Sequence, residues 1–175
     1  DPAANPFISR DYWAIKVNQD GLPEWDVDIE ADTIDNLNSV IQTSDGGYLL
    51  GGTSLSGLGL EKTVDQIGRK DYWLVKLTGE GNVSWQRTYG EGGYDELFDV
   101  EETEDGGFLL SGISIPDTSG WGSIDAWIIK TGPQGDLEWD KLLGTKREDL
   151  LPNIVKTTDN RYFLLGSSNG PKNPI

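Results

Sequence analysis

The stretch at positions 71–77, DYWLVKL, indicates both the local structure and the organisation of this 175-residue chain. Successive side chains of an extended strand point to opposite faces of its sheet. Trp73, Val75 and Leu77 would therefore share one face, and the residues between them would share the other. Both faces carry large apolar side chains, so the pattern predicts a strand that is covered on both sides.

The beginning of this stretch returns twice elsewhere in the chain, as DYW at 11–13 and as DAW at 125–127. The first tryptophans of the three copies are 60 and 54 residues apart, and a second set keeps the same spacings. This second set is Trp25, Trp85 and Trp139. An internal repeat of this length is typical of solenoids, propellers and arrays.

Each copy divides into four short strand-like runs with turn signals between them. The sequences DGG at 45–47 and 105–107, and DNR at 159–161, separate the first two runs of each copy. Asp-Gly between apolar runs favours a hairpin, because glycine adopts positive φ without steric cost. No segment of ten or more residues shows a helical period. The sequence therefore predicts an all-β fold, a β-propeller of four-stranded antiparallel blades with tryptophans packed between them.

The repeat boundaries predict one domain, residues 1–175, with three blade equivalents. Two blades would span about 35–94 and 95–149, and a third would be split between about 11–34 and 150–167. Propellers typically have four to eight blades, and a split blade leaves open strand edges. Three arrangements remain open: a homodimer that completes a six-bladed ring, further repeats of a longer polypeptide, or a three-blade ring within one chain.

The composition narrows the classes of partner and chemistry. Thirty acidic and 14 basic residues give a net charge of −16, which disfavours nucleic acid and anionic membranes. The chain has no Cys and no His, which excludes thiolate metal sites and His-dependent triads. No apolar run is long enough to span a bilayer. The absence of Met, even at position 1, indicates a processed or excised piece, and the composition favours an extracellular or cell-surface location.

Three aspartates recur where each first run begins: Asp35, Asp95 and Asp149. In a propeller they would form a ring of carboxylates near the axial mouth, which is a candidate Ca²⁺ site. The alternative is that each aspartate caps its own loop by accepting backbone N–H bonds. The alternating acidic residues at 26–32 do not match the spacing of a calcium loop, and they fit the solvent face of an edge strand. No other cofactor is expected.

The variable loops at 53–70 and 114–124 offer the candidate ligand site. Trp121 belongs to neither periodic tryptophan set, and on a loop it could be a platform for a sugar or a peptide. It could equally fold over a neighbouring blade. Tyr94 would lie on the same face, next to the acidic pair Asp95 and Glu96.

The repeat also resembles a known family. The motifs WQRTYG at 85–90, TEDGGF at 103–108 and DAWIIK at 125–130 are similar to a widespread secreted repeat. Such repeats occur in type IX-secreted surface proteins of Bacteroidota and in archaeal surface proteins, and are understood as β-propeller blades. The similarity covers about residues 11–166. The third copy departs from it at 159–161 and at 141–143, which puts its hairpin and its outer strand in doubt.

Together these features predict a non-catalytic module of the cell surface or the extracellular space, which binds protein or glycan through its loop face. Two alternatives stay open. One is a glycan-active enzyme that uses paired carboxylates such as Asp95 and Glu96. The other is a purely structural segment of a larger surface protein.

Overall fold

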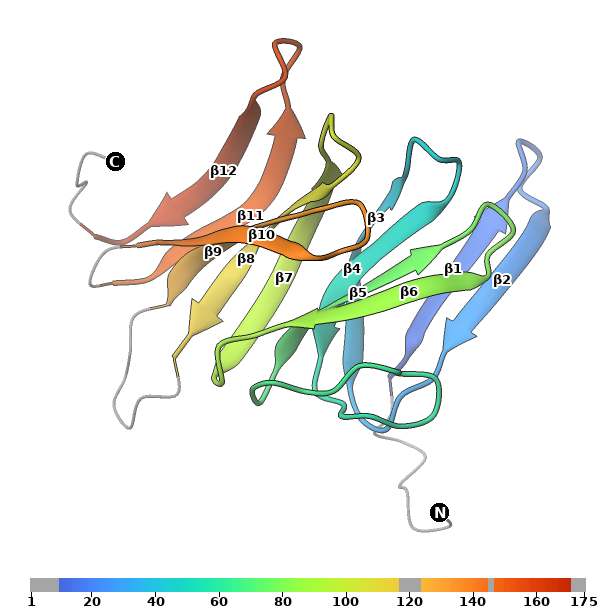
Figure 1. Ribbon diagram of the computed structural model, residues 1–175, viewed down its shortest axis with the longest axis horizontal. Coiled ribbons are helices and arrows are strands. Elements are labelled where there is room, and N and C mark those ends of the chain that lie inside the picture. Colours follow the sequence, from blue (N-terminus) through green and yellow to red (C-terminus); the bar gives the residue numbers. More distant parts are fainter. Residues whose placement is uncertain (1–9, 117–123, 145–146, 171–175) are drawn as a thin grey trace.

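The computed structural model describes residues 10–116, 124–144 and 147–170, which form twelve strands and, within these ranges, no helix (Figure 1). The strands of the first half are β1 (Tyr12–Val17), β2 (Pro23–Ile29), β3 (Asp35–Gln42), β4 (Tyr48–Ser54), β5 (Asp71–Leu77) and β6 (Val83–Tyr89). Those of the second half are β7 (Tyr94–Glu102), β8 (Phe108–Ile115), β9 (Asp125–Thr131), β10 (Leu137–Leu143), β11 (Asp149–Lys156) and β12 (Tyr162–Ser168). Consequently, no helix in the described part of the chain could cross a membrane. The predicted all-β class is confirmed.

The strands form four antiparallel sheets in chain order. The first sheet is β1–β2, the second is β3–β4–β5–β6, the third is β7–β8–β9–β10, and the fourth is β11–β12. Figure 1 shows the two short sheets at opposite ends of a row, with the two four-stranded sheets between them. The four runs predicted for each copy are present, and the strands of the third copy form as well.

Tight turns with positive φ join the first two strands of each copy. Gly46 and Gly106 have φ of 85° and 79°, and Asn160 replaces them in the third copy with φ of 61°. Asparagine tolerates this left-handed conformation better than most residues. The hairpin between β11 and β12 therefore forms despite the loss of the Gly-Gly pair.

The alternation of β5 divides its side chains between two cores, as the sequence predicts. Tyr72 and Leu74 face the third sheet, in a core that also contains Trp127. Trp73 and Val75 face the first sheet on the other side. Every residue of β5 is buried, which explains why this strand carries large apolar side chains on both faces.

Tyrosine hydroxyls join successive sheets at equivalent positions. Tyr12 Oη donates a hydrogen bond to the Trp73 carbonyl oxygen at 3.1 Å, and Tyr72 Oη donates one to the Trp127 carbonyl oxygen at 3.3 Å. The rings of each pair are in contact, with centroids 4.3 and 4.9 Å apart. A buried tyrosine thus combines apolar packing with a satisfied hydroxyl.

The first strands of three sheets are also linked through one carboxylate. Asp99 on β7 accepts a hydrogen bond from Ser39 Oγ of β3 at 2.8 Å. Its other oxygen accepts one from the backbone N–H of Ile154 on β11 at 2.9 Å. Asp99 therefore ties the third sheet to both of its neighbours.

The row of sheets does not close on itself. Within the described residues, β1 pairs only with β2, and β12 pairs only with β11. The arrangement in which one chain forms a closed three-blade ring is therefore wrong. The sheets stack in sequence, and this keeps the two two-stranded sheets at opposite ends of the row (Figure 1).

Candidate functional site

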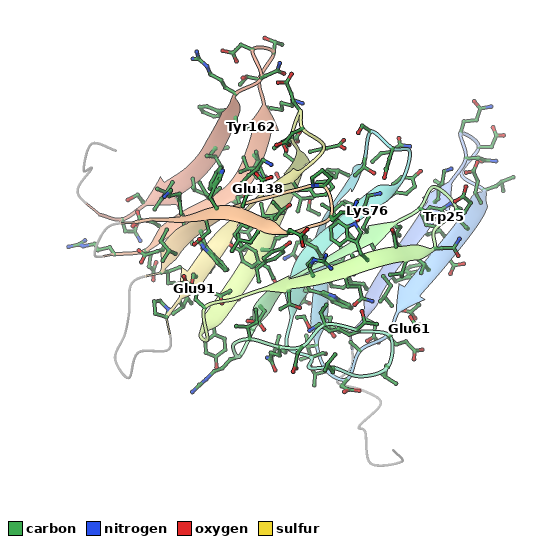
Figure 2. All side chains as sticks on the ribbon, in the orientation of Figure 1. Trp25, Glu61, Lys76, Glu91, Glu138 and Tyr162 are labelled. Carbon is green, nitrogen blue, oxygen red and sulfur yellow. The ribbon has the colours of Figure 1, made fainter. Side chains whose placement is uncertain are left out.

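One end of the molecule gathers the irregular connections, and we call it the loop end. It consists of the β4–β5 connection at 55–70, the β6–β7 connection at 90–93, and the starts of β3 and β7. The tight hairpin turns at 45–47, 105–107 and 159–161 lie at the opposite end, the hairpin end (Figure 1). Figure 2 places Glu61 and Glu91 at the loop end and Tyr162 toward the other.

Lys62 anchors the long connection from within. Its side chain is buried, and Nζ donates a hydrogen bond to the Ser56 carbonyl oxygen at 2.6 Å while lying 5.5 Å from the ring centre of Trp73. Ser56 Oγ in turn donates to Asp35 Oδ2 at 2.7 Å. Burial lowers the pKa of Lys62, although the nearby carboxylates oppose this effect. The connection is thus held in one conformation by its own polar groups.

Two buried carboxylates flank the β6–β7 connection. Asp71 accepts hydrogen bonds from the backbone N–H groups of Ile67 and Gly68, each at 2.8 Å. Asp95 accepts one from the Glu91 N–H at 2.9 Å, but its Oδ1 is buried without a partner. Burial raises the pKa of Asp95 to about 6, and it raises that of Asp71 as well.

The structure does not bring the three predicted metal-binding aspartates together. Asp35, Asp95 and Asp149 each stand at the start of a different sheet, and no group of three acidic side chains in the described ranges could hold a metal ion. Stacked sheets lie about 10 Å apart, whereas Ca²⁺ needs oxygens at about 2.3–2.6 Å. Asp95 instead accepts a hydrogen bond from the backbone N–H of Glu91 in its own loop, which is the alternative that the sequence left open. Asp35 accepts one from the Ser56 hydroxyl of the β4–β5 connection.

The other predicted site residues have separate roles. Tyr94 is 43% exposed at the loop end, and the guanidinium of Arg69 lies 5.7 Å from its ring centre. Glu96 forms an ion pair with Lys70. Asp95 and Glu96 are neighbours on β7, so they point to opposite faces of the sheet. Trp121 lies outside the described residues.

The loop end also exposes aliphatic side chains that are not among the predicted site residues. Leu58, Leu60 and Ile67 all project from the β4–β5 connection, and Leu60 is 67% exposed with a φ of 48°. The available signal was the run GLGL at 57–60, where apolar residues alternate with glycine inside a loop. These side chains lie on a connection that Lys62 holds in place.

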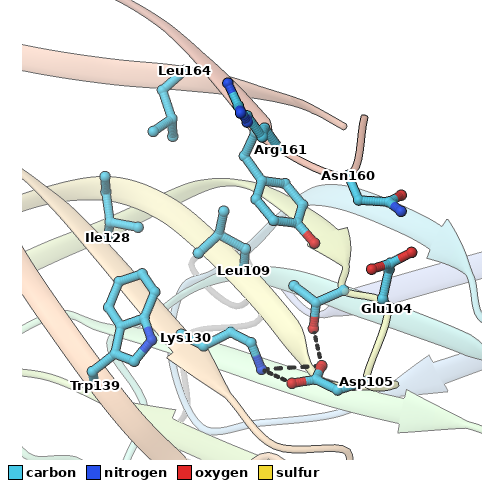
Figure 3. Close-up of a pocket in the computed structure, with 11 residues that line it drawn as sticks. Glu104, Asp105, Leu109, Ile128, Lys130, Trp139, Asn160, Arg161 and Leu164 are labelled. Carbon is cyan, nitrogen blue, oxygen red and sulfur yellow. Dashed lines mark hydrogen bonds and ion pairs between the residues drawn. The ribbon is translucent and has the colours of Figure 1, made fainter. Parts of the chain in front are cut away.

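A second feature is an apolar groove of about 640 Å³ between the third and fourth sheets. Figure 3 shows Leu109, Ile128 and Trp139 on one side of it and Leu164 on the other, with Lys130 bound to Asp105 at its rim. No sequence signal predicts this groove.

Comparison with known proteins supports the fold alone. No protein-family model matches the sequence, and no curated protein matches it either. A solved structure from Bacteroides caccae, described as a protein of unknown function, is similar with a TM-score of 0.52 and 15% sequence identity. The similarity covers 88% of this chain and 50% of that one, so this chain spans half the length of its structural neighbour.

Proposed function

We propose that this protein is a non-catalytic binding module built of β-propeller blades, which acts in the extracellular space or at the cell surface. Each four-stranded sheet is one blade in this proposal, and the first and fourth sheets are the two halves of a split blade. The equivalent Tyr–Trp contacts between successive sheets support it, because they give adjacent sheets the same packing relation.

The loop end is the proposed binding surface, and its ordered aliphatic side chains carry this proposal. Leu58, Leu60 and Ile67 are exposed on a connection that is fixed beneath by Lys62 and Ser56. A site that is already ordered loses little conformational freedom when a ligand binds. Exposed aliphatic groups suit a protein ligand, since apolar contacts form the centre of protein interfaces.

A glycan ligand is the second candidate, and Tyr94 favours it. Its ring is exposed at the loop end, close to the polar and charged groups of Arg69 and Glu96. An aromatic ring offers apolar stacking area, and neighbouring polar groups can bind hydroxyls.

The geometry argues against the glycan-hydrolase alternative. Asp95 has the raised pKa of a general acid, but its side chain is fully buried, so no substrate reaches it. Glu96 points to the opposite face of β7, and the two carboxylates of a glycosidase must flank one bond. The raised pKa is explained by the structural burial of Asp95.

Leu60→Asp and Tyr94→Ala test these proposals against panels of purified extracellular proteins and glycans. Leu60→Asp should abolish protein binding, and Tyr94→Ala should abolish glycan binding. The control is Leu22→Ala, which changes a leucine of similar exposure, 61%, in the β1–β2 turn at the hairpin end. Binding that the control weakens as much as the two loop-end variants would refute the proposed surface.

A further inference from the structure

The junction between the third and fourth sheets repeats the junction between the second and third, but in the described residues the fourth sheet has two strands where the others have four. We call the core between the second and third sheets the complete core, and the junction between the third and fourth sheets the open junction. Apolar residues of the open junction occupy the same repeat positions as residues of the complete core. They include Leu109, Ile128, Leu143, Ile154, Tyr162 and Leu164. The complete core also contains Trp127 and Ile129 of β9. Within the described residues the fourth sheet has no strand at that place, and the open junction keeps its groove there.

β1 carries the side chains that the groove lacks. Trp13 and Ile15 occupy the repeat positions of Trp127 and Ile129. Trp127 is 4% exposed and Ile129 is fully buried, whereas Trp13 and Ile15 are 59% and 44% exposed. Both project from the face of the first sheet opposite to Tyr12, which packs on the second sheet. Trp13 and Ile15 are therefore the repeat equivalents of the apolar side chains that the groove lacks.

The strand edges match in the same way. In both four-stranded sheets the second strand pairs with the third in one register, shown by Gly52 with Trp73 and by Gly112 with Trp127. Among the strands of the described residues, β12 is a second strand without a third, and β1 is a third strand without a second. The same register places Gly166 opposite Trp13 and Leu165 opposite Ala14.

Charge complementarity supports this register. The lysine of each third strand pairs with the aspartate of the first hairpin of the same sheet, as shown by Lys76 with Asp45 at 2.9 Å and Lys130 with Asp105 at 3.0 Å. The corresponding residues of the split sheet are Lys16 and Asp159. They stand at opposite ends of the molecule, bound to Glu24 and Arg161.

We propose that β12 of one chain pairs with β1 of a second copy, so that Trp13 and Ile15 of each copy fill the groove of the other. This rests on the proposed blade architecture. Two such seams related by a twofold axis close a ring of twenty-four strands, which is six four-stranded blades. With three blade equivalents per chain, six is the one multiple within the usual range of four to eight blades.

One residue departs from the repeat at this seam. Gly107 leaves no room for a side chain, since a Cβ there would lie 2.0 Å from the Thr131 carbonyl oxygen. Arg161 occupies the same position in the third copy and would face the Val17 carbonyl of the partner copy. The hairpin end of the seam must therefore open slightly, and Arg161→Gly should tighten the dimer.

The molecular mass in solution is the first test. Light scattering on the 175-residue chain should give twice its mass of 19.2 kDa. Trp13→Ala should raise the dissociation constant about thirtyfold or more, since a central tryptophan that is lost from an interface has a large effect. A chain that is monomeric at all concentrations overturns the proposal, and it would indicate that another segment completes the blade.

Cross-linking tests the register, and the natural chain has no cysteine to interfere. Facing residues of paired strands lie close enough for a disulfide. The double variant Ala14→Cys/Leu165→Cys should therefore give a covalent dimer under oxidation. Ile15→Cys/Leu165→Cys shifts the register by one residue and points the two thiols to opposite faces, so it should not. Equal cross-linking of both variants overturns the proposed register.

Charge reversal separates this seam from the proposed ligand-binding surface. Lys16→Asp should weaken the dimer, and the double variant Lys16→Asp/Asp159→Lys should restore it. Failure of the double variant to restore it overturns the proposed register. Leu60→Asp at the loop end should leave the mass unchanged, so a failed seam and a failed ligand site give different results.

Discussion

The two junctions on either side of the third sheet carry apolar side chains at equivalent repeat positions but have very different surfaces. Between the second and third sheets, Trp127 and Ile129 are buried in a continuous core. Between the third and fourth sheets, equivalent residues line an open groove, and Trp139 is exposed although its counterpart Trp85 packs near Phe108. The burial of a repeated residue therefore depends on the strand beside it as well as on its own position.

Truncation of the two equivalent tryptophans should give the largest difference in the free energy of unfolding. Trp127→Ala removes a buried ring from the complete core, and we expect it to lower the free energy of unfolding by about 3–5 kcal/mol. Trp13→Ala should lower it by less than about 1 kcal/mol in dilute monomer, because the ring is largely exposed. Urea denaturation at low protein concentration measures both. Equal losses would show that the first sheet is already covered.

The pH dependence of stability should differ between the two ends of the third sheet. Burial raises the pKa of Asp95 at the loop end to about 6, so this group binds more protons in the folded state than in the unfolded state between about pH 4 and 6. Its contribution to stability therefore falls as the pH rises through that window. Asp95→Asn should raise the free energy of unfolding at pH 8 by about 2–3 kcal/mol, and by much less at pH 4. Thermal denaturation across this range measures the difference.

The pKa of Asp105, at the hairpin end of the same sheet, is shifted in the opposite direction. Hydrogen bonds from Thr103 and Lys130 lower its pKa to about 2, so it stabilises the fold above its unfolded pKa, and this contribution is lost as the pH falls through 2. Asp105→Asn should therefore leave unchanged the slope of the free energy of unfolding against pH between pH 5 and 8. A slope that changes as much in Asp105→Asn as in Asp95→Asn would contradict the assignment.

The tyrosine hydroxyls allow a smaller test at equivalent positions. Tyr72→Phe removes one buried hydrogen bond to the Trp127 carbonyl, which should cost about 1 kcal/mol. The third copy has Ala126 at this position, where the sheet that it faces has no third strand. Ala126 is only 2% exposed, so Ala126→Tyr overfills a buried position and should lower the free energy of unfolding by about 1–3 kcal/mol. Chemical denaturation checks both variants.

The hairpin ion pairs should show the smallest difference. Asp45→Ala separates a partly exposed carboxylate from Lys76, and we expect a loss of about 0.5–1 kcal/mol. Asp159→Ala should have no measurable effect in dilute monomer, because its exposed pairing with Arg161 is within one hairpin. Thermal denaturation of the two variants in parallel would reveal a difference of this size.

The sequence predicts the strands well because their signals are local. The alternation at 71–77, the turns at 45–47 and 105–107, and the repeat spacing locate both four-stranded sheets and both two-stranded sheets. The candidate site was predicted less well. Asp95 accepts a hydrogen bond from its own loop and Asp35 accepts one from Ser56 on the β4–β5 connection, and a repeated position cannot reveal whether its copies meet in space. The anchoring role of Lys62 depends on a connection without a counterpart in the other copies.

The Asp99 carboxylate has a consequence for how the molecule melts. It holds the first strands of three successive sheets in one hydrogen-bonded line. Proteins built of tandem units often lose them one at a time, since each unit contacts only its neighbours. Here a single residue in the third sheet is shared by both flanking sheets, and heat should therefore disrupt the ten strands of the second, third and fourth sheets in one cooperative transition, with Asp99→Ala dividing it into two.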